Sequence, residues 1–450
     1  MSRRLRDPAP SRDRLPGGTL PWVVVAVVIV VAGTVATVVR PLAPDLGAVP
    51  DPSRWFGPDL LARIAAYRTP LRRAALVATA VDLGVPLVVA FTPAGRRLVS
   101  RIVRAVGVDR PARAAAAVGG VVVVAVSVVR LPVDAWAYRH ARSFGLSTQS
   151  PGGWLGDRMI ALGVDVVVVA LVLLVGYALA RRWPRHWVLV AAPAGLAAIA
   201  VATVVGPILI EPLRYDVTPL ADGPTRRAVA QVLEADDRGD ADVLVADASR
   251  RTTRQNAYVS GLWGTRRIVL YDTLLERPPP QVAQIVAHEL AHDRHRDLLR
   301  GVLAGGAGLL VVCVLVDRVL RWRVRRGLQR EPADPFGAGV VVAVVVVALV
   351  ATEPVVAAIS RRAEAAADAG ALQLLADVSD YCAAQRGLVE RNLSDPAPPE
   401  WARLWWWTHP PAASRLELAS RVADDGCAPE GEVTSRRDRG LRVLSLPPHA

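Results

Sequence analysis

Seven long apolar stretches alternate with polar intervals along this chain of 450 residues. A helix of about 20 apolar residues spans the hydrocarbon core of a bilayer, and each stretch reaches or approaches that length. The stretches cover residues 21–39, 74–91, 114–133, 159–180, 187–210, 299–320 and 336–359. The first is long for the core of a signal peptide and lacks a clean cleavage site before Arg40, so we expect it to be retained. The pattern predicts a multi-pass protein of the cell membrane with seven spans.

Shorter helices and a small sheet are predicted in the polar intervals. Between the fifth and sixth spans we expect a helix at 222–236, a strand at 242–247, a hairpin of strands at 256–262 and 267–271, and a helix at 281–297 that follows three prolines. After the seventh span we expect a helix at 361–375. The fold class is therefore mostly α-helical, with seven transmembrane helices and a small β-hairpin or sheet in the polar part.

This alternation divides the chain into six segments. They are a basic N-terminal segment (1–20), a five-span membrane domain (21–210), the first part of a polar domain (211–298), a transmembrane hairpin of spans 6 and 7 (299–360), the second part of the polar domain (361–423), and a polar tail that we expect to be disordered (424–450). The hairpin thus interrupts the polar domain in the sequence.

Composition supports the membrane assignment. The chain is 52% hydrophobic, and its mean hydropathy of +0.31 is high for a soluble protein of this size. The net charge of +13 comes entirely from arginine, and many arginines flank apolar runs. Because no basic stripe is interleaved with aromatic residues, we expect no nucleic-acid partner. The three cysteines form no C-x-x-C pair, which predicts neither a disulfide framework nor a cysteine-ligated metal.

The sequence His288-Glu289-Leu290-Ala291-His292 is the strongest chemical signal in the chain. On a helix, residues i and i+4 share one face, so the two imidazoles can bind one metal ion. Glu289 can then take a proton from a water held by that metal, as in a zinc peptidase. The alternative is a polar helix that carries two histidines by chance.

A catalytic zinc site needs a third protein ligand and an open position. Glu364 is the best candidate, because it follows the seventh span as closely as His292 precedes the sixth, and the two spans form a hairpin. Asp368 lies one turn further on the same face, where it can orient a histidine ligand or act as an acid. Asp293 and Asp297 can also support the histidines, and neither can be assigned. The alternative is that Glu364 and Asp368 form a solvated helical face.

Taken together, these motifs resemble the M48 metallopeptidases, and among them the Ste24-type CAAX prenyl proteases. The residues that carry the resemblance are Asn256-Ala257-Tyr258, the segment 267–275, the H-E-x-x-H sequence, Glu364-x-x-x-Asp368, and Thr408-His409-Pro410-Pro411 with Arg415. The loop at 142–150 also looks like that family. The resemblance implies a gluzincin-like metalloprotease region, so that 211–298 and 361–423 would be the two parts of one peptidase domain.

The resemblance also implies roles for individual residues. One zinc ion per chain would be bound by His288, His292 and Glu364, with Glu289, Asp368 and His409 as catalytic residues. Asn256, Ala257, Tyr258 and Arg415 would bind the substrate, the first three through a strand edge that a peptide joins as an added strand. For His409 the alternative is a turn residue before two prolines.

The expected partners are protein or peptide substrates and the lipid bilayer. The substrates would be membrane-associated chains, either unfolded or prenylated-like, and the sequence does not name them. A competing hypothesis is a metal-binding or transport protein without proteolysis, although the ionisable cluster lies at helix ends and no inverted repeat is visible.

The two arguments on orientation disagree, because the arginine distribution puts the zinc site outside the cell and the family resemblance puts it in the cytoplasm.

Overall fold

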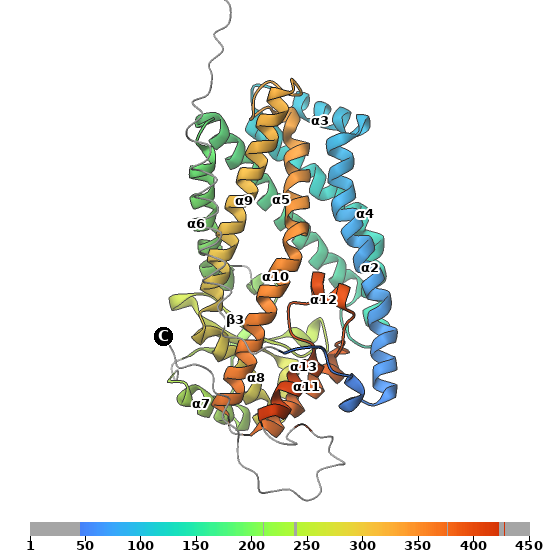
Figure 1. Cartoon of the computed structure of the whole chain (residues 1–450), viewed down its shortest axis with the longest axis vertical. Coiled ribbons are helices and arrows are strands. Elements are labelled where there is room, and N and C mark those ends of the chain that lie inside the picture. Colours follow the sequence, from blue (N-terminus) through green and yellow to red (C-terminus); the bar gives the residue numbers. More distant parts are fainter. Residues whose placement is uncertain (1–45, 210, 238–240, 376, 423–426, 428–450) are drawn as a thin grey trace, which may run out of the picture.

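The computed structural model describes residues 46–209, 211–237, 241–375, 377–422 and 427 (Figure 1). Within these ranges six helices are long and apolar enough to cross a membrane: α2 (Pro58–Phe91), α4 (Pro111–Ser143), α5 (Pro151–Arg182), α6 (Trp187–Leu209), α9 (Asp297–Arg325) and α10 (Ala338–Leu374). They contain the second to seventh predicted spans and confirm the mostly helical fold class. The predicted span at 21–39, the segment 1–20 and, except for Cys427, the tail at 424–450 lie outside the described residues.

Large apolar side chains remain exposed on the outer faces of these helices. Val172 on α5 and Val201 on α6 are at least 60% exposed, and Leu349 on α10 is 57% exposed. Such surfaces are unfavourable in water and suit lipid tails, while the helix satisfies its own backbone hydrogen bonds. The outer faces of the bundle are therefore the lipid-facing surface.

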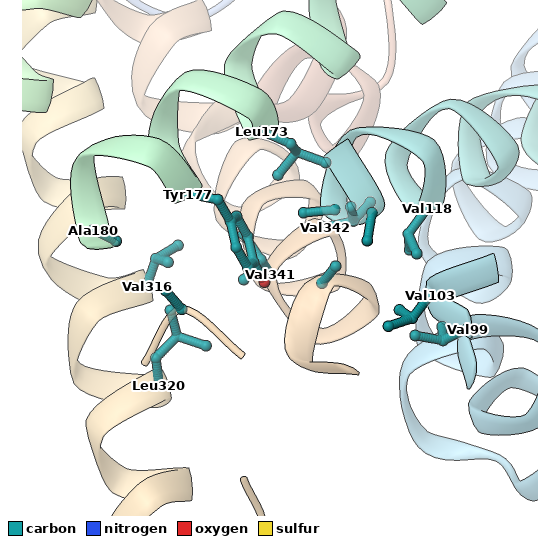
Figure 2. Packing of buried hydrophobic residues seen from close by; sticks show 14 of the residues in the cluster. Val99, Val103, Val118, Leu173, Tyr177, Ala180, Val316, Leu320, Val341 and Val342 are labelled. Carbon is teal, nitrogen blue, oxygen red and sulfur yellow. The ribbon is translucent and has the colours of Figure 1, made fainter. Parts of the chain in front are cut away.

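At one end of the bundle the spans share a core with a short helix, α3 (Pro93–Val106), which the apolar pattern did not predict. Figure 2 shows Val99 and Val103 of α3 in the same cluster as Tyr177 of α5 and Val341 of α10. Gly119 allows α4 to approach α5 closely, because a β-carbon there would lie 2.3 Å from a methyl group of Leu173. This end is the upper one in Figure 1.

The other end carries a mixed sheet of four strands in the order β1-β2-β4-β3. The strands are β1 (Val217–Pro219), β2 (Val243–Ala246), β3 (Ala257–Ser260) and β4 (Arg267–Tyr271). The predicted hairpin is confirmed, because β3 and β4 pair in antiparallel fashion. β2 runs parallel to β4, and β1, which was not predicted, pairs with β2. The order leaves β3 at an edge of the sheet. The helices α7 (Pro224–Ala235) and α8 (Pro279–Arg294) share a hydrophobic core with it.

Three further helices complete this end: α11 (Val378–Asn392), α12 (Glu400–Trp406) and α13 (Ala412–Val422). A disulfide joins Cys382 of α11 to Cys427, which follows α13. The prediction of no disulfide was therefore wrong. The two cysteines are separated by 45 positions in the sequence and meet only because α11 packs against α13, so no local spacing signals the bond.

The last span and the helix predicted after it are one continuous helix. α10 runs from the upper turn through the apolar region and into the lower part of the molecule, where it packs against α8 (Figure 1). Its first turns bury apolar residues, whereas its last third buries Glu364 and Asp368. The two acidic residues are therefore held by the same rigid element that crosses the membrane.

Candidate metal centre

The centre is built first on α8, whose start is fixed by proline. Pro279 and Pro280 occupy the first turn, where a missing N–H breaks no helical hydrogen bond. Val282, Ile285 and Val286 are buried in the core shared with the sheet, so the helix is held along its apolar face. One turn apart on this buried helix lie His288 and His292. The packed helix therefore fixes the positions of the two imidazole side chains.

Glu364 completes a set of three ligand atoms with the two histidines. One ligand atom from each residue lies within 4.8 Å of the other two. The distance between the two Nε2 atoms is 3.1 Å, and Glu364 Oε2 lies 3.2 Å from Nε2 of His288. Glu364 Oε1 lies 3.5 Å from Nε2 of His292. The predicted third ligand and the two histidines are thus brought together across 72 residues of sequence.

These residues fit a divalent metal ion such as zinc. Two imidazole nitrogens and a carboxylate oxygen are the donors of many catalytic zinc sites. Oε2 of Glu364 is buried and makes no hydrogen bond. A buried carboxylate oxygen without a hydrogen bond is unfavourable, and a metal ion between the three donors would satisfy it. The donor set therefore favours a metal over a purely structural cluster.

A second carboxylate supports each histidine on its other ring nitrogen. Asp368 Oδ1 lies 3.0 Å from Nδ1 of His288, and Asp297 Oδ2 lies 2.8 Å from Nδ1 of His292. A carboxylate on Nδ1 fixes the ring orientation and leaves Nε2 for a metal. Asp297 reaches back because Arg296 adopts a left-handed conformation, with φ 54°, between α8 and α9. Of the two unassigned aspartates, Asp297 supports a histidine, whereas Asp293 pairs with Arg266 at 3.1 Å.

Arg415 on α13 binds the carboxylate behind His288. Its Nε donates to Asp368 Oδ2 at 2.9 Å, and its Nη2 donates to Oδ1 of the same carboxylate. Asp368 is fully buried, so this ion pair is shielded from solvent. Although burial alone would lower it, the pKa of Arg415 is raised by the attraction of Asp368. The chain Arg415–Asp368–His288 thus ties three helices to the centre.

A cavity of about 410 Å³ opens beside the centre. Its lining includes His288, Glu289, Arg415, Asn256 and Ala257, together with 406–410. Four candidate residues are not among the lining residues: Tyr258, His292, Glu364 and Asp368. The cavity therefore brings most of the candidate site residues to one surface, while Asp368 lies behind His288.

His409 also faces the ligands, and 58% of its side chain is exposed. Its Nε2 lies 3.2 Å from Oε1 of Glu364, and its Nδ1 lies 3.0 Å from the Thr408 hydroxyl. Partial burial lowers the pKa of His409; the negative charge of Glu364 opposes this effect, and the positive charge of Arg415 adds to it. A neutral imidazole at this position can donate one hydrogen bond to a group in the cavity.

The pKa values of Glu289 and His292 are shifted upward. Burial is the main cause for Glu289, because it disfavours the charged carboxylate. Burial would lower the pKa of His292, but hydrogen bonds to Asp297 and Glu364 raise it to about 10. Protons and a metal ion therefore compete for His292, and Glu289 is a stronger base than a free carboxylate.

The free edge of β3 runs past Glu289. The Tyr271 N–H donates to the Asn256 carbonyl, so with the observed register Tyr258 and Val269 form the next hydrogen-bonded pair. Val259 lies between such pairs, and its N–H points away from β4. That N–H donates to the Glu289 carboxylate, which partly offsets the effect of burial on its pKa. The edge is therefore adjacent to the candidate base.

Asn392 was not among the candidates, although its side chain holds the start of this edge. It accepts from the Gln255 N–H at 2.8 Å and donates to the Gln255 carbonyl at 2.9 Å. Nothing in the sequence around Asn392, at the end of a helix, signals a contact with a segment 137 positions away.

The side chain of Tyr258, a predicted substrate-binding residue, does not line the cavity. Its ring lies edge-on to the ring of Tyr271, with 6.3 Å between the ring centres.

A membrane-helix bundle with a histidine–glutamate metal centre defines a membrane metallopeptidase, and comparisons with known proteins agree. The family model for peptidase family M48 matches residues 219–423, and the model for the five membrane helices of the CAAX prenyl protease N-terminal region matches 53–215. The chain belongs to peptidase family M48.

Individual proteins are also similar to this chain. The Bacillus subtilis protein named "Uncharacterized metalloprotease YhfN" is 26% identical over 83% of this chain and 89% of its own length. The CAAX prenyl protease 1 homolog of Arabidopsis thaliana is 36% identical, but over only 19% of this chain and 21% of its own. The crystal structure of S. mikatae Ste24p has the same fold, with a TM-score of 0.69, 19% identity, and coverage of 89% of this chain and 99% of that one.

Proposed function

We propose that the protein is a zinc-dependent endopeptidase that hydrolyses peptide bonds of membrane-associated polypeptides. The observation that carries the proposal is the convergence of His288, His292 and Glu364, with His288 and the neighbouring Glu289 on the cavity wall. When bound, a zinc ion would supply a Lewis acid and lower the pKa of a coordinated water to ~7. The proposed substrates are unfolded or prenylated-like chains at the membrane.

The protein residues divide the remaining work. Glu289 takes a proton from the attacking water and passes it to the leaving amine. His409 donates to the oxygen on which negative charge develops. For Asp368 we propose the orienting role, supported by its contact with His288 Nδ1 and its distance from the cavity lining. Arg415 is proposed to position Asp368, since its guanidinium is bound by that carboxylate.

The substrate is proposed to bind along β3 as an added strand. Ala257, which lines the cavity, and Val259 both lie between hydrogen-bonded pairs, so their outward backbone groups can pair with a substrate strand. A strand paired there would bring a scissile carbonyl near Glu289, because Val259 already contacts that carboxylate. Recognition through the backbone would tolerate many substrate sequences.

Metal analysis combined with Glu289→Gln tests the proposal. The purified protein should contain about one zinc per chain, and Glu289→Gln should keep the metal and lose peptide hydrolysis by orders of magnitude. Glu364→Ala should lose most of the metal. Full metal content in Glu364→Ala would remove the third ligand from the proposal. Zinc uptake into vesicles by a wild type without proteolysis would favour the transport hypothesis.

His409→Ala tests the proposed donor. Loss of one oxyanion donor should lower kcat by about 10²-fold with zinc content and KM unchanged. Thr408→Ala is a matched control, because it removes only the hydrogen bond to Nδ1 of the same imidazole. Unchanged kinetics in His409→Ala would return this histidine to the role of a turn residue.

A further inference from the structure

Short loops at the end of the bundle opposite the metal centre are rich in arginine. The three connections there, 92–110, 183–186 and 326–337, carry eight arginines. The one short connection at the other end, 144–150, carries none. Arginine in short loops marks the cytoplasmic side of a membrane protein, whereas large domains are translocated largely without regard to charge. The arginine-rich end therefore has the character of a cytoplasmic surface.

Helix α3 gives this end a surface suited to anionic lipid. Val99 and Val103 are buried in the bundle core, while Arg97, Arg101 and Arg104 are exposed. Within the part of the chain that the structure describes, these three arginines are in no ion pair. α3 thus packs its apolar face against the bundle and presents these arginines at the outer surface of this end. Anionic lipids of the cytoplasmic leaflet attract such arginines.

Three arginines near the metal-centre end are held by contacts within the protein, whereas Arg63 and Arg73 on α2 are exposed. Arg54 pairs with Glu417 at 2.8 Å, and Arg72 pairs with Asp395 at 2.6 Å. Arg68 donates to the Leu393 carbonyl. These side chains hold α2 and the segment before it against residues 377–422, which belong to the peptidase part of the chain (211–298 and 361–422, with Cys427). They are used within the protein, so they say little about orientation.

The disulfide supplies an independent observation. Cys382 and Cys427 are bonded in the peptidase part, on the side of the molecule that holds the metal centre. Disulfides persist in oxidising compartments and are rare in the cytoplasm, where thiols are kept reduced. The remaining cysteine, Cys313, is a buried free thiol in the middle of α9.

We propose that the catalytic cavity of this enzyme faces the extracytoplasmic side of the membrane. Its substrates are then extracytoplasmic segments of polypeptides, such as unfolded chains at the outer surface of the membrane. This orientation is opposite to the one that the family resemblance implies. The substrate class rests on the proposed function, whereas the orientation does not.

Two matched aspartate-to-cysteine variants test the orientation in a Cys313→Ala background. Asp222, before α7 in the peptidase part, has a side chain that is 99% exposed, and Asp109, in the arginine-rich loop, has one that is 80% exposed. Right-side-out spheroplasts are treated with a membrane-impermeant charged maleimide before and after permeabilisation. Asp222→Cys should be labelled in sealed spheroplasts, and Asp109→Cys only after permeabilisation. The reverse pattern, or labelling of both in sealed spheroplasts, overturns the proposal.

A second experiment counts the free thiols of the wild-type protein and tests whether the disulfide is present. Acid-quenched cells are denatured, and free thiols are alkylated with a maleimide-linked polymer that shifts the band on a gel. One modified thiol is expected without reductant and three with it. Three modified thiols in both samples would overturn the disulfide argument. Peptide hydrolysis by both aspartate variants in detergent tests the proposed activity separately, because solubilised enzyme has no sidedness. Reversed labelling with normal hydrolysis would refute the proposed orientation and leave the proposed peptidase activity standing.

Discussion

Replacing Val259 with proline isolates the proposed strand addition. The outward N–H of Val259 is removed, whereas the β3–β4 ladder keeps its hydrogen bonds, because Val259 lies between hydrogen-bonded pairs. Proline also fits the extended backbone that the preceding residue already has. Tyr258→Pro is the opposing control, because it removes a ladder hydrogen bond to Val269 and should destabilise the sheet.

The expected size of the effect follows from one lost hydrogen bond. Leaving one substrate acceptor without its hydrogen-bond donor should weaken binding by about 1–3 kcal/mol, which lowers kcat/KM by about 5- to 150-fold. Because the bond forms in the ground state and in the transition state alike, KM should rise while kcat changes little. Val259→Thr keeps the N–H and should stay within about 2-fold of wild type.

A second readout comes from Glu289. In the free enzyme the Val259 N–H stabilises the charged form of this carboxylate and so lowers its pKa. Without that bond the pKa should rise, and the acid limb of the kcat/KM profile should move to higher pH in Val259→Pro. The profile is measured with a fluorogenic peptide in detergent, and zinc content and circular dichroism report whether the variant is folded.

The result that refutes strand addition is equal kinetics for Val259→Pro and Val259→Thr. If the proline variant does not fold, peptides carrying one N-methyl group at successive positions test the same edge with wild-type enzyme. At least one position should raise KM by a similar factor, since the edge carbonyls must accept from substrate N–H groups. Uniform tolerance of N-methylation would also refute the strand model.

Three further outcomes are expected. Asp297→Asn should weaken zinc binding about 10- to 100-fold, whereas the control Asp293→Asn should not, and equal zinc affinities in competition with a chelator would contradict the supporting role. Cys382→Ala with Cys427→Ala should lower the free energy of unfolding by about 2–4 kcal/mol, read as a lower Tm, and an unchanged Tm would show that the bond adds no stability. Because burial raises the pKa of Glu289, activity should fall as pH drops through a limb above pH 4.5, and a limb below that value would contradict this role.

Local patterns predicted the parts of the fold that depend on local sequence. Apolar runs located the described spans, alternation located β3 and β4, and the spacing of His288 and His292 placed both on one helix face. Glu364 was proposed as the third ligand because a membrane hairpin returns the chain to its starting side. These signals are strong because a bilayer and a helix each impose a fixed length or period.

Contacts between distant segments left no such signal. Asp297 meets His292 only because Arg296 adopts a left-handed conformation, which no residue preference of arginine indicates. Asn392 meets the backbone of Gln255 through the packing of α11 beside the sheet. The disulfide depends in the same way on α11 and α13. Each of these contacts follows from tertiary packing, which a single sequence does not encode in its spacing.

The order of the ligands along the chain has a consequence for biosynthesis. His288 and His292 are synthesised before α9, and Glu364 only after the apolar part of α10. The third ligand can reach the histidines only when the α9–α10 hairpin is inserted and has returned to the same side. With the proposed ligand set, a nascent or wrongly inserted chain would have only two of the three ligands and should bind metal weakly. On the proposed mechanism, peptide hydrolysis should therefore require insertion of both helices in the membrane.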